Sequence, residues 1–254
     1  MESIKNLDIQ VEDGILKLKL NNIKKKNSIT SIIFKKVIEL FEKSKNDDTI
    51  KVIYISSTGD FFSSGSDFNN FRDGTMDEMI EMFGIFVNTL IECPKVLIAG
   101  VNGAAIGVSF SMLAHFDIVL CSDTAFFQTP FIQTFQTPEA CSSYLFPLLL
   151  GKSMAGHILI NGGPMTAEEA KNLGFVAKIF SYDSFDADAY EYVQGVAKNP
   201  LRSLTKFKSM MNKHSKEILK QINKEECYEL RESWKQKEFE AIINKFTKDK
   251  KPKF

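Results

Sequence analysis

The residues with the clearest chemical potential lie in two short glycine-containing segments, 61–68 and 102–108. The second of these, Asn-Gly-Ala-Ala-Ile-Gly-Val, follows an apolar run at 96–101 and is expected to lead from a buried strand through a turn into a helix. The first backbone N–H groups of a helix have no partner within the helix, so they can hold an anion. Glycines let a ligand approach such a backbone closely. Taken alone, the segment is explained equally well as a plain strand–turn–helix connection.

The segment 61–68, Phe-Phe-Ser-Ser-Gly-Ser-Asp-Phe, follows another short apolar run at 51–55. In α/β proteins ligands bind beyond the carboxyl ends of the strands, which is where this loop of small residues is expected to lie. The order strand, glycine loop, helix thus occurs twice in the chain. This repetition favours a ligand site over a plain connection.

A third chemical group, the carboxylate of Glu139, follows a segment that resembles a ligand-lining loop. Residues 129–138 are rich in Phe, Thr and Gln and have proline near both ends. Pro138 and Glu139 are expected to begin a turn of helix that continues through Ser143. A glutamate in a first helical turn interacts favourably with the helix dipole, so an exposed capping carboxylate is the simple interpretation of Glu139.

Other reactive side chains give weaker signals. The chain has three histidines, His115, His157 and His214. Their spacing is not that of a metal-ligand set, and we expect no metal site. Ser109 and Ser111 lie near His115 but lack the glycine pattern of a nucleophile elbow. Cys141 is expected to be a packed small residue rather than a reactive thiol.

Composition narrows the class of protein. The chain has 254 residues, is 44% hydrophobic and carries 32 basic and 32 acidic side chains. With no net charge there is no overall field to attract nucleic acid or a membrane surface. No apolar run approaches the roughly 20 residues that span a bilayer, and neither a secretory leader nor a transit peptide is expected at the N-terminus. Four cysteines without a close metal-ligand pair indicate reduced thiols in an intracellular protein.

Periodicity and capping signals predict mixed α/β structure followed by helices. We expect strands at 8–11, 15–20, 51–55, 96–101, 116–121, 125–128 and 175–180. We expect helices at 28–45, 76–92, 108–114, 153–160 and 166–174, and then from 184 onward with a break at 199–200 and a final helix at 216–248. Residues 68–75 are expected to be irregular, and the change to helices near Pro200 marks the one credible boundary.

These motifs together resemble the crotonase (enoyl-CoA hydratase/isomerase) superfamily over nearly the whole chain. Residues 62–68 and 102–108 resemble its two oxyanion and coenzyme A loops. Residues 127–131 and 137–143 resemble more closely the peroxisomal-type Δ3,Δ2-enoyl-CoA isomerases. The resemblance implies an α/β crotonase-like (ClpP/crotonase) spiral of ββα units over residues 1–198, with a helical trimerisation region at 199–254 and therefore a homotrimer.

The resemblance also implies a site for an acyl-CoA thioester. Its carbonyl oxygen would lie between the backbone N–H groups of Ser66 and Val108, which would stabilise an enolate. Ser63, Ser64 and Gly65 would line the path of coenzyme A, and Asp67 would fix the loop. The full set of residues expected to contact substrate is Ser63, Ser64, Gly65, Asp67, Phe68, Gly107 and Phe131. Ordinary core packing remains the default for Phe126, Phe127, Phe131 and Phe135.

The expected reaction follows from the number of carboxylates. Hydration in this family uses two glutamates, but the matching positions here are Ser111 and Phe131. Moving a double bond from C3 to C2 needs one base, and Glu139 lies where the isomerases place it. We therefore expect a Δ3,Δ2-enoyl-CoA isomerase of unsaturated fatty acid β-oxidation. It would use no metal or redox cofactor, because coenzyme A is part of the substrate.

Two alternatives stay open. The crotonase-like domain of the chromodomain Y-like corepressors is similar in residues 86–89 and 127–130, which allows a non-catalytic acyl-CoA-binding or scaffold protein. This chain retains Glu139 at a position where the chromodomain Y-like pattern departs from glutamate, and this difference favours the enzyme. Another crotonase reaction such as thioester hydrolysis is also compatible with the fold. The family tendency is a peroxisomal location, although the terminus 251–254 differs from a Ser-Lys-Leu-type signal. The alternative location is the cytosol or the mitochondrion.

Overall fold

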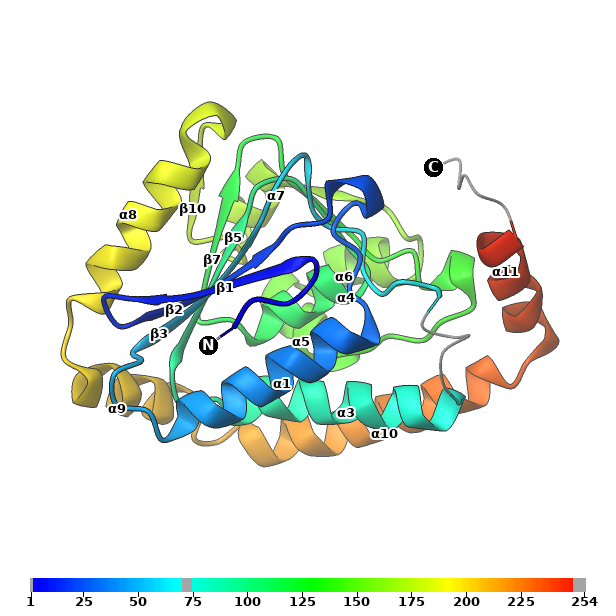
Figure 1. Ribbon diagram of the computed structural model, residues 1–254. Coiled ribbons are helices and arrows are strands. Elements are labelled where there is room, and N and C mark those ends of the chain that lie inside the picture. Colours follow the sequence, from blue (N-terminus) through cyan, green and yellow to red (C-terminus); the bar gives the residue numbers. More distant parts are fainter. Residues whose placement is uncertain (1, 70–74, 249–254) are drawn as a thin grey trace.

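The computed structural model describes residues 2–69 and 75–248, which form two β-sheets surrounded by helices (Figure 1). The strands are β1 (Leu7–Glu12), β2 (Ile15–Leu20), β3 (Val52–Ser57), β4 (Phe61–Ser63), β5 (Val96–Val101), β6 (Ala104–Ile106), β7 (Ile118–Ser122), β8 (Phe126–Gln128), β9 (Met165–Thr166) and β10 (Lys178–Phe180). The helices are α1 (Ser31–Lys45), α3 (Met76–Glu92), α4 (Val108–Ser111), α5 (Ser142–Leu150), α6 (Lys152–Leu159), α7 (Ala167–Asn172), α8 (Phe185–Ala197), α9 (Leu201–Asn212), α10 (Lys216–Trp234) and α11 (Lys237–Lys248).

The larger sheet has the strand order β1-β2-β3-β5-β7-β10 and is parallel except for the β1–β2 hairpin. Every residue of β3 and β5 is buried, which explains the continuous apolar runs at 52–55 and 96–101. Ile53 and Ile55 face the main core, whereas Val52 and Tyr54 face a second core beneath α8. The sheet is thus covered on both faces.

The smaller sheet brings the two glycine segments side by side. Its order is β4-β6-β8-β9, and β4 pairs with β6 in parallel, with Phe61 opposite Ala104 and Ser63 opposite Ala105. Residues 61–63, expected to be part of a loop, therefore form a strand. Gly103 allows this pairing because a Cβ at this position would collide with the carbonyl group of Asp60.

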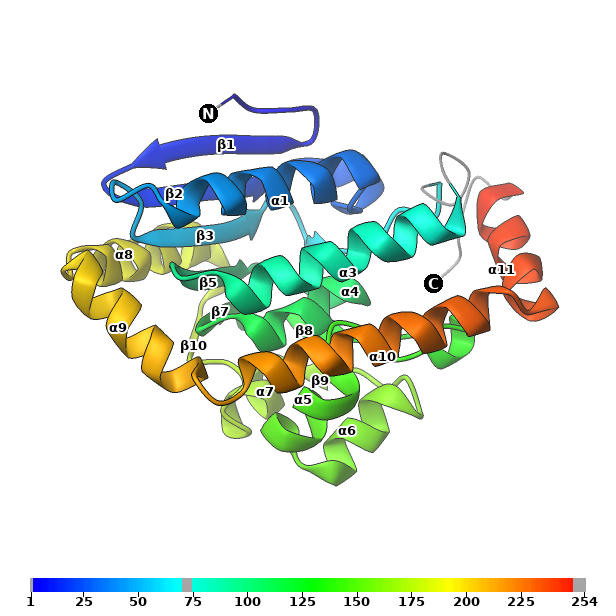
Figure 2. The same ribbon diagram turned by 90° about the horizontal axis from the view of Figure 1, so that it is seen from below.

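Helices α1, α3 and α10 lie side by side on one flank of the molecule (Figure 2). The predicted helix ending at residue 45 and the capping-box helix that begins after Thr75 are confirmed. The helix expected from residue 28 begins only at Ser31, and its N-cap is Thr30, whose side chain accepts from the backbone N–H of Ile33. Asn27 has a different role, since its Nδ2 donates to the carbonyl groups of Thr58 and Phe61.

Two predicted helices are divided in the structure. The helix expected at 108–114 consists of α4 followed by a 3₁₀ turn, and the helix expected at 216–248 is interrupted at Lys235 and Gln236 between α10 and α11. After this break, Phe239 of α11 stacks on Trp234 with ring centroids 5.3 Å apart. Of the segment expected to be irregular, residues 70–74 lie outside the described residues.

The helices after Pro200 pack against the core. Lys208 of α9 is buried and forms an ion pair with Asp117 over 2.7 Å. The proposed boundary at 198/199 and the trimerisation role of the helices that follow it stay predictions. Over residues 2–69 and 75–248, no helix combines the length and apolar character needed to cross a bilayer.

Candidate active site

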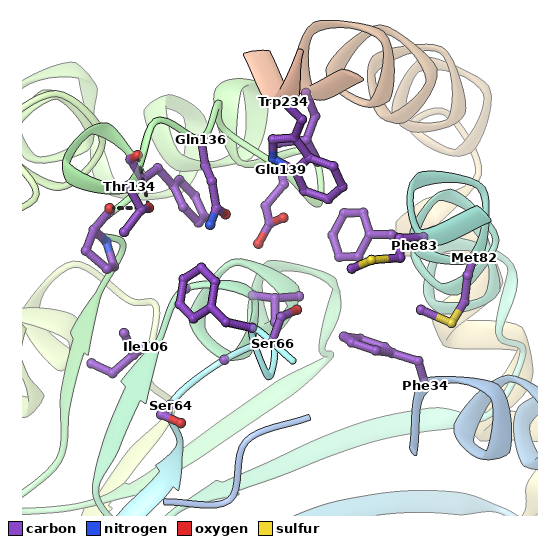
Figure 3. A pocket seen from close by; sticks show the side chains of 18 residues that line it. Phe34, Ser64, Ser66, Met82, Phe83, Ile106, Thr134, Gln136, Glu139 and Trp234 are labelled. Carbon is purple, nitrogen blue, oxygen red and sulfur yellow. Dashed lines mark hydrogen bonds between the residues drawn. The ribbon is translucent and has the colours of Figure 1, made fainter. Parts of the chain in front are cut away.

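One pocket gathers most of the residues singled out in the sequence (Figure 3). The residues that line it are Phe34, Ser64, Gly65, Ser66, Phe68, Met79, Met82, Phe83, Ile106, Gly107, Val108, Pro130, Phe131, Thr134, Gln136, Glu139, Leu230 and Trp234. They come from both glycine segments, the 130–139 loop and helices α1, α3 and α10. Of the predicted site residues only Ser63 and Asp67 lie outside this lining.

The first wall of the pocket, called here the amide wall, consists of residues 64–66 and 106–108. Gly65 and Gly107 have φ angles of 87° and 60°, a region that favours glycine. Their own backbone groups are occupied: the Gly65 carbonyl accepts from Ile29 and the Gly107 N–H donates to Gln128, both over 2.8 Å. Among the described residues, none accepts a hydrogen bond from the backbone N–H groups of Ser66 and Val108. Two backbone donors are therefore available at the pocket surface.

Ser109 ties the two halves of the amide wall together. Its Oγ donates to the carbonyl of Ser63 over 2.8 Å and accepts from the N–H of Ile106 over 2.8 Å. Both serines are fully buried. The expected place of Ser63 along the path of coenzyme A stays a prediction. Gly65 also packs closely on this bridge, since a Cβ there would lie 2.8 Å from the carbonyl oxygen of Ile106.

Asp67 supports the loop from outside the pocket. Its Oδ1 accepts from the N–H and Nδ2 of Asn69 over 2.9 and 2.7 Å, and its N–H donates to the carbonyl of Ile29 over 3.0 Å. The expected role in fixing the loop fits this geometry. Asp67 does not belong to the pocket lining, and its expected contact with the substrate stays a prediction.

Glu139 forms the opposite wall, and its carboxylate points into the cavity toward Ser66 (Figure 3). The side chain is buried, with 7% exposure, so the interpretation as an exposed capping carboxylate is wrong. The helix α5 begins only at Ser142, because Ala140 and Cys141 have φ angles of 55° and 62°. These two left-handed residues turn the chain so that Glu139 faces the pocket rather than solvent.

The environment of Glu139 favours its neutral form. Burial, reinforced by the nearby negative charge of Glu226, raises the pKa of Glu139 to about 8 from its ordinary value of 4.5. No ion pair or hydrogen bond to its carboxylate occurs within the described part of the chain. Such a carboxyl group is poised to exchange a proton near neutral pH.

Two distant side chains hold the loop that carries Glu139. The Oε2 of Glu226 in α10 accepts from the N–H of Cys141 over 2.6 Å, and its Oε1 accepts from the N–H of Ser143 over 2.9 Å. From the other side, Nε2 of His115 lies 2.8 Å from the carbonyl oxygen of Ala140. Burial lowers the pKa of His115 to about 4, so the imidazole is neutral and donates this bond. Sequence reasoning missed Glu226, which had no local signal.

Apolar side chains complete the pocket between the two walls. Phe34, Met82 and Phe83 face the cavity from α1 and α3, as Figure 3 shows, and Leu230 and Trp234 of α10 close another side. The sequence predicted these helices but not which of their apolar residues face the pocket. Of the four phenylalanines between 126 and 135, only Phe131 lines it. The others do not, with Phe127 fully buried and Phe135 45% exposed.

Glu139 is the one carboxylate among the described pocket residues. Ser111, where a hydratase has a glutamate, is fully buried outside the pocket lining, and Phe131 lines it with an apolar ring. No cluster of three or more His, Cys, Asp or Glu suited to a metal ion occurs within 2–69 and 75–248. The arrangement can therefore offer one proton-transferring group and two backbone donors in apolar surroundings.

Comparison with known proteins places this geometry in context. Residues 10–254 match the family model described as enoyl-CoA hydratase/isomerase. The chain is 38% identical over 255 residues to enoyl-CoA delta isomerase 2 of Rattus norvegicus, covering 98% of this chain and 65% of that protein. It is 33% identical to the peroxisomal enoyl-CoA delta isomerase 3 of Mus musculus, covering 95% and 78%. The human testis-specific chromodomain protein Y 1 is 30% identical, covering 98% and 48%.

The fold comparison agrees. A crystal structure of an enoyl-CoA hydratase/isomerase from Pseudoalteromonas atlantica superposes with a TM-score of 0.88 at 29% identity, covering 98% of this chain and 99% of that one. This likeness confirms the predicted crotonase-like α/β fold. The chain spans 65% of the rat relative's length. With two free amides facing a buried carboxylate on this fold, the chain belongs to the enoyl-CoA hydratase/isomerase family, within the crotonase superfamily.

Proposed function

We propose that this protein is a Δ3,Δ2-enoyl-CoA isomerase, which moves the double bond of a 3-enoyl-CoA to give the 2-trans-enoyl-CoA. The observation that carries the proposal is the pairing of one buried carboxylate, Glu139, with the free N–H groups of Ser66 and Val108 across an apolar pocket. The relatives named enoyl-CoA delta isomerase support the same reaction.

The first step removes a proton from C2. The ionised Glu139 carboxylate takes this proton, and the electron pair delocalises onto the thioester oxygen to give a dienolate. The N–H groups of Ser66 and Val108 donate to that oxygen as its negative charge develops. Preorganised donors of this kind are worth about 3 kcal/mol each in a transition state. Because main-chain atoms donate, the side chains at these positions contribute little.

The second step returns the proton at C4. Protonated Glu139 delivers it to the same face of the dienolate, the double bond settles between C2 and C3, and the carboxylate is regenerated. No water and no second acid is consumed, which fits a pocket lined by one titratable residue. Coenzyme A belongs to the substrate, and the reaction needs no other cofactor.

The raised pKa of Glu139 suits this shuttle. A carboxyl group with a pKa of about 8 is a stronger base than an ordinary glutamate once ionised, and it remains a competent acid for the return step. Activity is expected to rise with pH up to about 8 and then level off, because only the ionised form starts the reaction.

In the test, purified protein is incubated with a 3-enoyl-CoA and, in a separate reaction, with the matching 2-enoyl-CoA. Chromatography then separates the two enoyl thioesters, the 3-hydroxyacyl thioester and free coenzyme A. The proposal predicts isomerisation without hydration or release of coenzyme A. Thioester binding without turnover, measured by calorimetry, would instead identify an acyl-CoA-binding scaffold. Free coenzyme A as the main product would identify a thioester hydrolase.

Two further features belong to the proposal. The exposed apolar side chains of Phe207, Met210 and Met211 on α9 support association with further copies of the chain, for which we propose a homotrimer. A monomer in size-exclusion chromatography would contradict it. A peroxisomal location is supported by the name of the mouse relative, which includes that compartment. A part in fatty acid β-oxidation belongs to the proposal because the proposed substrate and product are enoyl-CoA thioesters.

A further inference from the structure

Glu226 is a buried carboxylate that the isomerase mechanism does not use. It lies on α10, and its side chain reaches the loop 139–143 with both oxygens. Three donors converge on it, because Oγ of Ser143 adds a bond of 2.5 Å to the two backbone bonds. Of the described residues, none provides a cation for an ion pair with it. Burying a carboxylate without a cation beside it costs free energy of folding. This cost is offset where the carboxylate is the acceptor for buried N–H and O–H donors that would otherwise have no partner.

The donors that need Glu226 belong to the turn beside Glu139. Ala140 and Cys141 are in the left-handed region, which disfavours residues with a Cβ. The backbone N–H of Cys141, fully buried, has Glu226 as its partner. Without this acceptor the turn would leave a buried donor unsatisfied, and a helical path through residues 139–142 would become competitive. Glu226 therefore favours the backbone path that directs Glu139 into the pocket.

The helix that carries Glu226 is itself fastened. One turn earlier, Nδ2 of Asn223 donates to the carbonyl of Gly84 over 2.9 Å and to Oδ1 of Asn88 over 3.0 Å, which ties α10 to α3. The same face of α10 continues to Leu230 and Trp234, which line the pocket. One helix face thus holds the base loop and shapes the apolar part of the site.

We propose that Glu226 is the positioning residue for Glu139, acting through the hydrogen bonds and the negative charge that its carboxylate brings to the loop 139–143. The inference rests on the proposed function for the role of Glu139 as base. It adds that a residue without substrate contact decides where this base points and over what pH range it works.

Other titratable groups near this loop do not supply the charge. Burial raises the pKa of the Cys141 thiol and that of Cys227 on α10, the latter to about 11, so both are neutral. His115 is neutral because burial lowers its pKa to about 4. The cation of Arg231, five residues further along α10, pairs with Asp77 over 2.7 Å. For Glu226 itself, burial raises the pKa, and the bonds from Ser143 and Cys141 work against that rise.

The test compares Glu226→Gln with Glu225→Gln, a neighbouring exposed residue of α10 that undergoes the same loss of charge. Infrared titration follows the carboxyl signal of Glu139, identified by its absence in Glu139→Gln. In Glu226→Gln the midpoint is expected to fall by about one pH unit, because the like charge that disfavours ionisation is gone. In Glu225→Gln it stays at the native value.

Activity gives an independent measure. The acid limb of kcat/KM for isomerisation is expected to move to lower pH in Glu226→Gln, with kcat reduced about tenfold and KM within about twofold of the native value. A native midpoint and an unmoved acid limb in that variant would overturn the proposal and leave Glu226 as a structural contact. If the native protein does not isomerise at all, the proposed function fails, but the infrared titration still decides the role of Glu226.

If Glu226→Gln does not fold, a second variant tests the positioning role of Glu226. Ser143→Ala removes one hydrogen bond to Glu226 and keeps its charge. We expect kcat to fall by about two- to fivefold while the midpoint of Glu139 remains native. A shifted midpoint in Ser143→Ala, or native kcat and KM, would contradict the assignment.

Discussion

The two walls of the pocket are held in position by different means. The amide wall consists of main-chain donors, and its geometry is fixed locally by the pairing of β4 with β6 and by the Ser109 bridge. The opposite wall presents one side chain, that of Glu139, on a loop fixed from a distance by Glu226 and His115. A wall made of backbone tolerates most side-chain changes, whereas a wall made of one carboxylate depends on that residue and its remote supports.

The largest effect is expected from replacing Glu139, which forms the opposite wall. Glu139→Gln keeps the size and burial of the side chain but removes the base, so kcat should fall by about 10² to 10⁴. KM should change little, because the amide wall still holds the thioester. Steady-state kinetics measure both, with Glu225→Gln as the control. A Glu139→Gln protein with native kcat would show that another group moves the proton.

The same residue predicts a pH-dependent stability difference. The pKa of Glu139 is about 8 in the folded protein and 4.5 ordinarily, so the folded state binds the proton more tightly. Stability contributed by this group is full below pH 4.5 and is lost as pH rises toward 8. Glu139→Gln should therefore be more stable than the native protein at pH 9 by roughly 2–4 kcal/mol, with little of this advantage at pH 4.

Denaturant unfolding at the two pH values checks this difference. The native protein and Glu139→Gln are compared at each pH, so that other titrating groups cancel. An advantage of the variant that is equal at both pH values would contradict the raised pKa and place the effect in packing alone.

A smaller effect is expected from bending the amide wall. Gly65→Ala introduces a Cβ 2.8 Å from the Ile106 carbonyl oxygen at a positive φ, which should displace the N–H of Ser66. We expect kcat/KM to fall by about tenfold to a hundredfold, the effect of losing one donor in part. Gly151→Ala is the matched control: its φ is also positive, but nothing lies within 4 Å. It should lose about 1 kcal/mol of stability and no activity.

Equal activity losses in the two alanine variants would indicate that backbone strain, rather than the position of the Ser66 donor, determines the result. A loss confined to Gly65→Ala would show that the amide wall works through geometry that glycine alone permits. The comparison thus separates the two ways in which a glycine can matter.

The two walls also differ in how far the sequence predicts them. Both glycine segments are visible locally, because strand, turn and small residues follow one another along the chain. The role of Glu139 came from family resemblance, while its local pattern wrongly indicated a capping carboxylate. That pattern could not reveal the left-handed Ala140 and Cys141, whose conformation depends on Glu226, 85 residues from Cys141 in sequence. Contacts of this range leave no periodic signal.

The helical part shows the same limit. Helical spacing predicted most of residues 184–248 correctly, but no glycine or proline marks the break at Lys235 and Gln236. The break follows from tertiary packing, since it lets Phe239 stack on Trp234 beside the pocket. Helix periodicity likewise cannot distinguish apolar residues of α3 and α10 that face the core from those that face a ligand.

The central claim, that one carboxylate carries the proton from C2 to C4, is tested most directly by label transfer. A 3-enoyl-CoA deuterated at C2 is converted in ordinary water, and the deuterium content at C4 of the product is measured by mass spectrometry and NMR. With a shuttle shielded from solvent, we predict that part of the deuterium appears at C4 and that this transfer is lost with Glu139→Gln. If the native protein forms product that carries only protium at C4, even in the first turnover, the single-carboxylate mechanism is contradicted.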